Sequence, residues 1–298
     1  MKLFSLLFIC LVSTLSFAQS KLAKTAINKL NEQLKVYETL SPHGDLYHYK
    51  DLKLSKIELL VFEGTDEVVN DSIESYAAIS IIQDKISKLL NTVFIIKSVE
   101  EFNLKNQLYS NINYIKSEDN KLHNLTLHAK SGGSYQSSLS YIYYKKNEEY
   151  IKVFETYDED ENSVFNADGY YSIDTISSRE GTKYLLIGSV RTCGMCFYDY
   201  VSLVYFKDGY FNQEFNFSVE SRSYDSKIFY NPSEFALSVF YETDDLNYHE
   251  CSCKETNNEE DVDYEEDIKE KQCSCLFIFN GLTFELTNQC SEAVIEKE

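Results

Sequence analysis

The chain has 298 residues, enough for one large domain or two ordinary ones, and its 43% hydrophobic and 26% charged residues are typical of a globular rather than a disordered protein. The net charge of −20 would repel a phosphate backbone, so we expect neither nucleic acid nor an anionic membrane surface as a partner. The 24 tyrosines and 19 phenylalanines favour β-sheet, because aromatic side chains pack well on half-buried strands.

Residues 1–18 have the pattern of a cleaved signal peptide. Lys2 supplies the charge, residues 3–12 form the apolar core, and Ser16-Phe17-Ala18 is a small-x-small cleavage site. The apolar run is too short for a membrane span, and no later run is long enough. We therefore expect a secreted or periplasmic protein without a membrane span. Cysteines form disulfides in such an oxidising compartment.

Residues 19–106 are predicted to form a small region of helices and strands. Apolar residues spaced by three and four over residues 21–40 predict an amphipathic helix. Asp71 followed by Glu74 resembles a capping box ahead of a second helix near residues 72–90. Residues 57–62 and 92–99 have the composition of strands.

From residue 107 to residue 298 the chain is predicted to be a β-repeat domain. Its three units, of about residues 110–162, 170–222 and 226–290, share one order of parts, and the third contains an acidic insertion at residues 254–272. Each unit has a turn at an equivalent place, namely Lys146-Asn147, Asp208-Gly209 and Asn280-Gly281, the last two being strong hairpin signals.

Each unit is predicted to form four short antiparallel strands, the outline of a β-propeller blade. We therefore expect a mainly β fold, α+β overall, with three propeller-like units after the small helical region. A propeller usually has about four to eight blades, so a closed ring would need the N-terminal strands or another subunit. The alternatives are a β-sandwich and an open stack of sheets. The likeness to a blade is architectural and names no family.

The loops between the second and third strands should emerge on one edge of the fold. They comprise residues 130–137, residues 191–198 and the acidic insertion. The sequence has eight cysteines, of which Cys10 lies in the predicted signal peptide. The other seven are predicted to gather on this edge.

Cys193-Gly194-Met195-Cys196 has thioredoxin-like spacing, but it joins two predicted strands and no helix follows. A disulfide at the hairpin tip is the preferred interpretation, with a metal knuckle and redox catalysis as the alternatives. Redox activity of this type needs the first thiolate at a helix N-terminus, where its pKa is lowered.

The triplets Cys251-Ser252-Cys253 and Cys273-Ser274-Cys275 flank the acidic insertion. In an antiparallel hairpin, the residue numbers of every opposed pair add up to the same sum. The pair Cys251 and Cys275 has the same sum as the pair Cys253 and Cys273, so both pairs would be opposed in one hairpin. This predicts two cross-strand disulfides that close the loop, with Cys290 left free or paired between chains. Alternatively, the four thiolates and His249 hold zinc or copper.

The acidic insertion is predicted to be a solvated loop, with a calcium-dependent or basic-partner contact as the alternative. Asp158, Asp160 and Asn162 have the alternating oxygen ligands of a calcium loop, although its glycine and closing glutamate are missing. Residues 166–169, Asn-Ala-Asp-Gly, resemble calcium-binding propeller loops only in part.

The sequence contains no Gly-x-Ser-x-Gly, phosphate-binding or His-Glu-x-x-His motif, and its five histidines form no recognisable catalytic set. Tyr135, Tyr141 and Tyr143 are candidates for stacking on sugars or peptides, although packing is the simpler role. We therefore expect a non-catalytic binding module, stabilised by disulfides, for a protein, peptide or glycan. The alternatives are a metal-binding or thiol-redox protein and an unrecognised hydrolase, and oligomerisation stays open.

Overall fold

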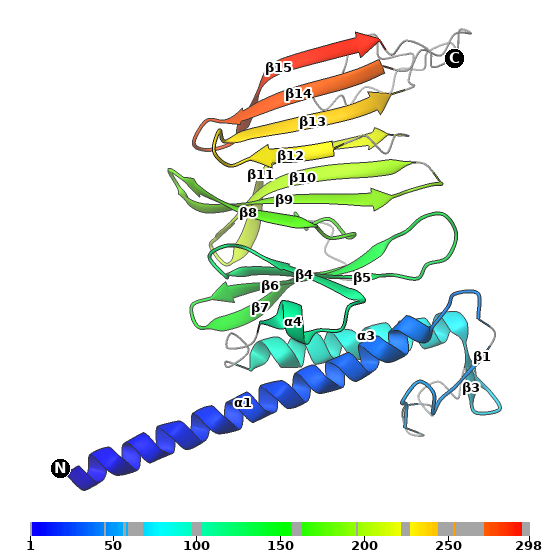
Figure 1. The fold of residues 1–298 in the computed structure, drawn as a ribbon, viewed down its shortest axis with the longest axis vertical. Coiled ribbons are helices and arrows are strands. Elements are labelled where there is room, and N and C mark those ends of the chain that lie inside the picture. The colour runs from blue at the N-terminus through cyan, green and yellow to red at the C-terminus, as the bar shows by residue number, and fades with distance from the viewer. Residues whose placement is uncertain are drawn as a thin grey trace. The chain divides into compact units, whose positions relative to one another are not determined.

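The computed structural model describes residues 2–44, 46–55, 58, 68–96, 103–156, 163–194, 196–221, 227–243, 253 and 271–293. It is mostly β, with antiparallel sheets and a few helices (Figure 1). The chain divides into two compact units, which are described separately. Unit 1 comprises Met1–Lys116, Asn120–Gly132 and Tyr141–Glu155, and unit 2 comprises Ser117–Asp119, Gly133–Ser140 and Thr156–Glu298. Among the described residues, no helix combines the length and the apolar composition that a membrane span needs.

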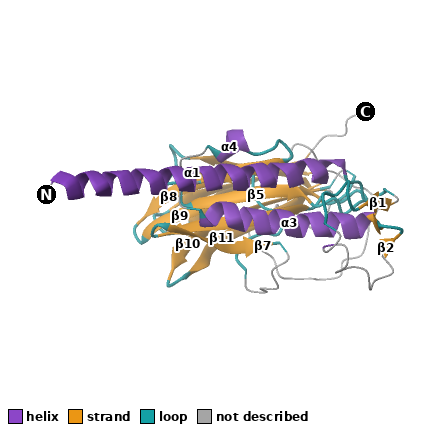
Figure 2. Cartoon of the chain, turned by 90° about the horizontal axis from the view of Figure 1, so that it is seen from below, coloured by secondary structure: helices purple, strands orange, loops and turns teal. Residues whose placement is uncertain are grey.

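Two long helices, α1 (Lys2–Thr39) and α3 (Ser75–Ile95), lie side by side in unit 1 (Figure 2). The predicted helix over residues 21–40 is confirmed, because the buried face of α1 follows the expected spacing of three and four. That face includes Ala23, Ala26, Ile27, Leu30, Leu34 and Tyr37. The helix α1 also continues through the predicted cleavage site at residues 16–18.

Two expectations for the second helix are wrong. Glu74 is the N-cap residue of α3 and its side chain makes no capping hydrogen bond, while Asp71 has a positive φ of 60° in the preceding turn. Residues 92–95, predicted to begin a strand, continue α3 because Val93 and Phe94 extend its buried face. The predicted strand at residues 57–62 lies outside the described residues, apart from residue 58.

Short elements complete the N-terminal part of unit 1: β1 (Leu46–His48), β2 (Val68–Val69), β3 (Ser72–Glu74) and α4 (Leu104–Gln107). The three strands form one sheet in the order β1-β3-β2. Ser55 and Glu58 make the reciprocal bonds of a capping box, which the sequence reading missed: Ser55 N donates to Glu58 Oε2 at 2.7 Å and Glu58 N donates to Ser55 Oγ at 3.2 Å. Lys85 Nζ lies 3.1 Å from Glu58 Oε1.

The first large sheet consists of β4 (Ile112–Lys116), β5 (Leu122–His128), β6 (Ser138–Lys146) and β7 (Glu149–Glu155) in sequence order. A buried amide links the helices to the end of β5. Gln83 Nε2 donates to Ala129 O and to the Tyr37 hydroxyl, both at 2.9 Å, and that hydroxyl donates to His128 O at 2.7 Å. Phe94 of α3 stacks on Tyr143 with ring centroids 4.0 Å apart.

Unit 2 contains two further four-stranded sheets, each a meander in sequence order. The first has β8 (Ser172–Ser178), β9 (Gly181–Arg191), β10 (Phe197–Lys207) and β11 (Tyr210–Ser221). The second has β12 (Lys227–Asn231), β13 (Ala236–Thr243), β14 (Lys271–Phe279) and β15 (Phe284–Ala293). One apolar core joins both sheets and includes Leu185, Val201, Leu203, Phe217, Leu237, Val239 and Phe277.

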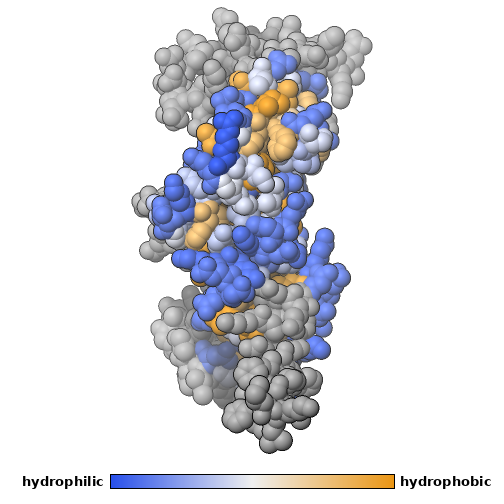
Figure 3. Space-filling view, turned by 90° about the vertical axis from the view of Figure 1, so that its left-hand side faces the viewer, coloured by the Kyte–Doolittle hydropathy of each residue, from blue (hydrophilic) through white to orange (hydrophobic). Residues whose placement is uncertain are grey.

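A buried ion pair joins the turn ends of these two sheets. Lys183 is 1% exposed, and its ammonium group pairs with the Glu214 carboxylate and donates to Leu282 O at 2.8 Å. Burial lowers the pKa of Lys183, opposed by the nearby Glu180 carboxylate. Figure 3 shows apolar patches on this face of the molecule. Phe235 is exposed, and its ring stacks against that of Phe279 with centroids 6.4 Å apart.

The three large sheets share a detail between their third and fourth strands. The register shifts between Ile142 and Tyr143, between Leu203 and Val204, and between Leu276 and Phe277, in each case shortly before the closing turn. Such a shift marks a β-bulge, an extra residue on one strand. The described residues contain no closed barrel or ring of sheets, so the propeller arrangement stays a prediction.

Candidate functional site

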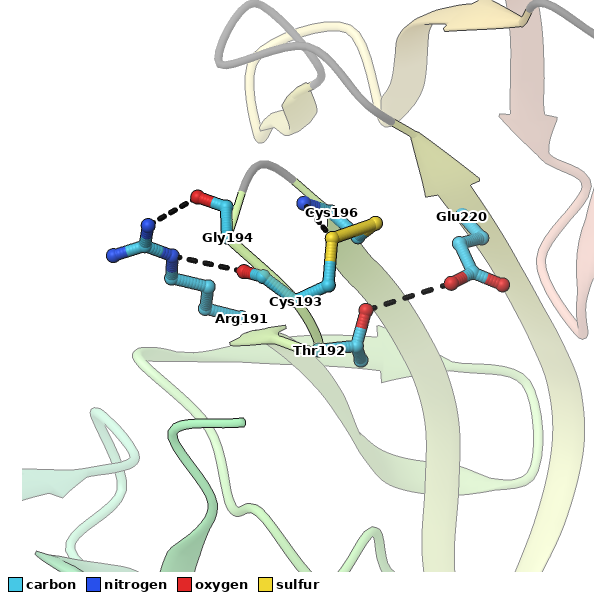
Figure 4. The surroundings of a disulfide bond; sticks show 6 residues. All are labelled: Arg191, Thr192, Cys193, Gly194, Cys196 and Glu220. Carbon is cyan, nitrogen blue, oxygen red and sulfur yellow. Dashed lines mark hydrogen bonds between the residues drawn. A yellow bond between two sulfur atoms is a disulfide. The ribbon is translucent and has the colours of Figure 1, made fainter. Parts of the chain in front are cut away.

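The β9–β10 turn is closed by a disulfide between Cys193 and Cys196 (Figure 4). Two hydrogen bonds reinforce it. Thr192 N donates to Cys196 O at 3.0 Å, and Cys196 N donates to Cys193 Sγ at 2.9 Å. The predicted disulfide at a hairpin tip is therefore present, and hydrogen bonds of the backbone close the same turn.

Arg191 folds back over this turn, as Figure 4 shows. Its Nε donates to Cys193 O at 3.0 Å, and its Nη2 donates to Gly194 O. Thr192 Oγ1 donates to Glu220 Oε1 at 3.4 Å, which ties the turn to the end of β11. The planar guanidinium satisfies two carbonyl groups at once and so restricts the conformation of the turn.

The loop before β6 lies against the same turn within unit 2. Gln136 N donates to Arg191 O at 2.9 Å. Tyr135 OH donates to Asp168 Oδ2 at 3.0 Å, and Ser138 N donates to Asp168 Oδ1 at 2.8 Å. The two loops between second and third strands therefore meet, as the predicted order of strands requires. We call the surface formed by Tyr135, Gln136, Asp168 and residues 191–194 with Cys196 the disulfide edge.

Two tyrosines bind the backbone on either side of Asp168. Asn166 N donates to the Tyr170 hydroxyl at 2.7 Å, and the Tyr200 hydroxyl donates to Gly169 O. The rings of Tyr170 and Tyr200 meet edge to face with centroids 5.7 Å apart. Burial raises the pKa of both hydroxyls, so both stay protonated at physiological pH.

The second disulfide corrects the predicted pairing of the cysteine triplets. Cys253 is bonded to Cys275, with Cα atoms 5.8 Å apart, and not to Cys273, which is disulfide-bonded as well. In the β13–β14 ladder Val239 lies opposite Cys275. In the same ladder Tyr241 lies opposite Cys273, so the second triplet is paired with residues 239–241 of β13 and not with the first triplet.

Burial also corrects the prediction that all seven cysteines gather on one edge. Cys253 and Cys275 are each 2% exposed and belong to the core between the two sheets of unit 2. Among the cysteines whose burial the structure describes, Cys193 and Cys196 lie on the disulfide edge. The strands β9 and β13 do end on the same side of unit 2 (Figure 1), as expected for meanders.

The candidate metal sites lie largely outside the described residues, which is the case for His249, Cys251, Asp158, Asp160 and Asn162. Within the part of the chain that the structure describes, no group of three or more His, Cys, Asp or Glu residues is arranged to hold a metal ion. Zinc, copper and calcium binding therefore stay predictions. The Asp168 carboxylate, in the partial Asn-Ala-Asp-Gly match, accepts hydrogen bonds from the protein itself.

Of the three tyrosines proposed to stack on a ligand, only Tyr135 has an accessible ring, at 42% exposure. Tyr141 and Tyr143 are each 2% exposed and pack in the protein. The sequence reading missed Arg191 and Asp168 as the residues that fix the edge. The turn-forming sequence at residues 166–169 was the one local signal for Asp168.

No family model, no curated protein and no solved structure matches the chain.

Proposed function

We propose that the protein is an exported, non-catalytic binding module, and that the disulfide edge is its ligand surface. The observation that carries the proposal is the hydrogen bond from Gln136 N to Arg191 O, which joins two loops from different sheets into one surface. Loops held on a rigid scaffold are the usual place for ligand recognition. A surface already fixed by a disulfide and hydrogen bonds also loses less conformational entropy on binding.

The chemistry of the edge favours a peptide or a glycan. The Tyr135 ring offers an exposed flat face, and its hydroxyl is fixed by Asp168. An aromatic ring held in this way can stack on a sugar or on an apolar peptide side chain. Ser134 and Gln136 beside Tyr135 are exposed and polar, which suits a ligand that makes hydrogen bonds.

Binding should be tested with the full chain on a glycan array and a peptide library, followed by affinity measurements on any ligand found. Tyr135→Ala should weaken binding by about tenfold or more, as truncation of an aromatic anchor does. Tyr210→Ala is the matched control, since Tyr210 is 60% exposed but lies at the β10–β11 turn, at the other end of the strands. Equal losses in both variants, or no ligand in either library, would contradict the proposal.

Export is the second part of the proposal. The N-terminal pattern supports it, and so do the disulfides, which persist mainly in oxidising compartments. N-terminal sequencing of the protein recovered from its native host should begin at Gln19, and an intact Met1 would contradict this part.

A further inference from the structure

We propose that the Cys193–Cys196 disulfide is a thiol-exchange site, which a dithiol opens in the folded protein without opening the core disulfide. The exchange stands on the turn geometry alone. Its consequence, that reduction loosens the disulfide edge and weakens ligand binding, rests on the proposed function.

The Cys193–Cys196 and Cys253–Cys275 disulfides differ in access. Cys253 and Cys275 are each 2% exposed within the apolar core. Cys193 and Cys196 are half-buried on a turn whose Gly194 is exposed, with nothing within 4 Å of the position that a Cβ of Gly194 would occupy. Exchange requires a thiolate to reach a sulfur atom, so access alone predicts that the turn disulfide reacts first.

The turn also favours one of its sulfurs as the leaving group. Cys196 N–H donates to Cys193 Sγ at 2.9 Å, and a hydrogen bond to a sulfur strengthens when that sulfur becomes an anion. The Arg191 guanidinium, bonded to Cys193 O and Gly194 O, places a positive charge over the same turn. Nearby cations and N–H donors stabilise a thiolate, so we expect the thiolate at Cys193.

The reaction follows from this assignment. One thiolate of a dithiol attacks Cys196 Sγ, the Cys193–Cys196 S–S bond breaks, and its electron pair stays on Cys193 Sγ as a thiolate. The second thiolate of the reductant then attacks the reductant sulfur of the mixed disulfide and releases Cys196 as a thiolate. The dithiol is oxidised to a cyclic disulfide and loses two electrons and two protons. The turn receives the two electrons as two thiolates, and each thiolate takes up a proton according to its own pKa.

Opening the turn acts directly on the proposed ligand surface. The disulfide spans the residues that Arg191 and Thr192 hold through Cys193 O, Gly194 O and Cys196 O. Arg191 O in turn accepts the hydrogen bond from Gln136 N of the neighbouring loop. Without the covalent link, these bonds alone hold the turn, and the two loops gain conformational freedom.

The first experiment titrates the folded full chain with dithiothreitol, with no denaturant, and labels free thiols with an alkylating reagent. Mass spectrometry of the peptides then follows each cysteine separately. We expect Cys193 and Cys196 to be labelled at least about tenfold faster than Cys253 and Cys275. Equal rates for both pairs, or labelling only when the protein unfolds, would overturn the proposal.

The second experiment assigns the leaving group with two matched variants. Cys196→Ser leaves a single thiol at Cys193, and Cys193→Ser leaves a single thiol at Cys196. The alkylation rate of each variant, measured against pH, should show a lower pKa for the Cys193 thiol. A Cys193 pKa equal to or above that of Cys196 would overturn the assignment.

The link to ligand binding has its own readout. For any ligand found on the array, affinity should fall when the turn disulfide alone is reduced and return on reoxidation. Because exchange is measured without a ligand, failure of the ligand screen leaves the exchange result intact. Selective exchange with unchanged affinity would overturn only the coupling.

Discussion

Gly188→Ala is expected to disrupt the support of the disulfide edge. A Cβ at Gly188 would lie 2.3 Å from Tyr200 Cε2 and 2.5 Å from Gly169 O, and the backbone carbonyl cannot rotate away. The Tyr200 hydroxyl also donates to this carbonyl. Overpacking costs about 1–3 kcal/mol, and loss of a buried hydrogen bond costs a further 1–3 or so. The free energy of unfolding should therefore fall by roughly 2–6 kcal/mol.

Gly194→Ala is the matched control, because a Cβ there meets nothing within 4 Å. Its effect should stay within about 0.5 kcal/mol. Urea unfolding of the full chain can be followed by tyrosine fluorescence and circular dichroism, since the chain has 24 tyrosines and no tryptophan. Equal unfolding midpoints for the two variants would show that Tyr200 moves aside at no cost, and would refute the predicted overlap.

The same unfolding assay tests two more substitutions. Gln83→Met should destabilise by about 2–4 kcal/mol, because it removes two buried hydrogen bonds, whereas Gln33→Met should change little, since Gln33 Oε1 has no partner among the described residues. Lys183→Met should cost about 2–4 kcal/mol, less than for a fully buried pair because its carboxylate partner is 24% exposed. The Ser55 N–H, together with its hydroxyl and a lysine, lowers the pKa of Glu58 from 4.5 to about 2 against the opposing effect of burial. The folded protein therefore resists a protonation that the unfolded chain accepts, and stability should fall as pH drops from 4.5 toward 2. On acidification from pH 4.5 toward 2, the Glu58→Gln variant should therefore lose less stability than the exposed-site control Glu149→Gln, as measured by thermal unfolding. An equal loss would contradict the assignment.

Periodicity predicted the parts of the fold that depend on neighbours in sequence. The spacing of apolar residues located α1, and turn signals such as Asp208-Gly209 located the hairpins. Periodicity could not predict contacts between residues that are far apart in the sequence. The end of α3 at Ile95 is set by packing of Val93 and Phe94, which resembled a strand in sequence.

The cysteine pairing failed for a related reason. The constant-sum rule assumes that the two triplets lie opposite each other, but the second triplet lies opposite Val239 and Tyr241 of β13. In the candidate site, the turn disulfide followed from the short spacing of Cys193 and Cys196 alone. The role of Asp168 depends on a loop some thirty residues earlier in the chain, at Tyr135 and Ser138, and no local pattern carries that information.

The bulges between third and fourth strands bear on how faithfully this chain folds. Three meanders of similar pattern in one chain risk pairing a strand with the wrong neighbour, a known failure of proteins built from like segments. A slip of one residue would also turn every side chain to the opposite face. In each sheet the extra residue lies on the fourth strand, shortly after the closing turn. It admits one alignment of β7, β11 and β15 with the neighbouring third strand, and adds twist that makes these outer strands poor templates for another chain.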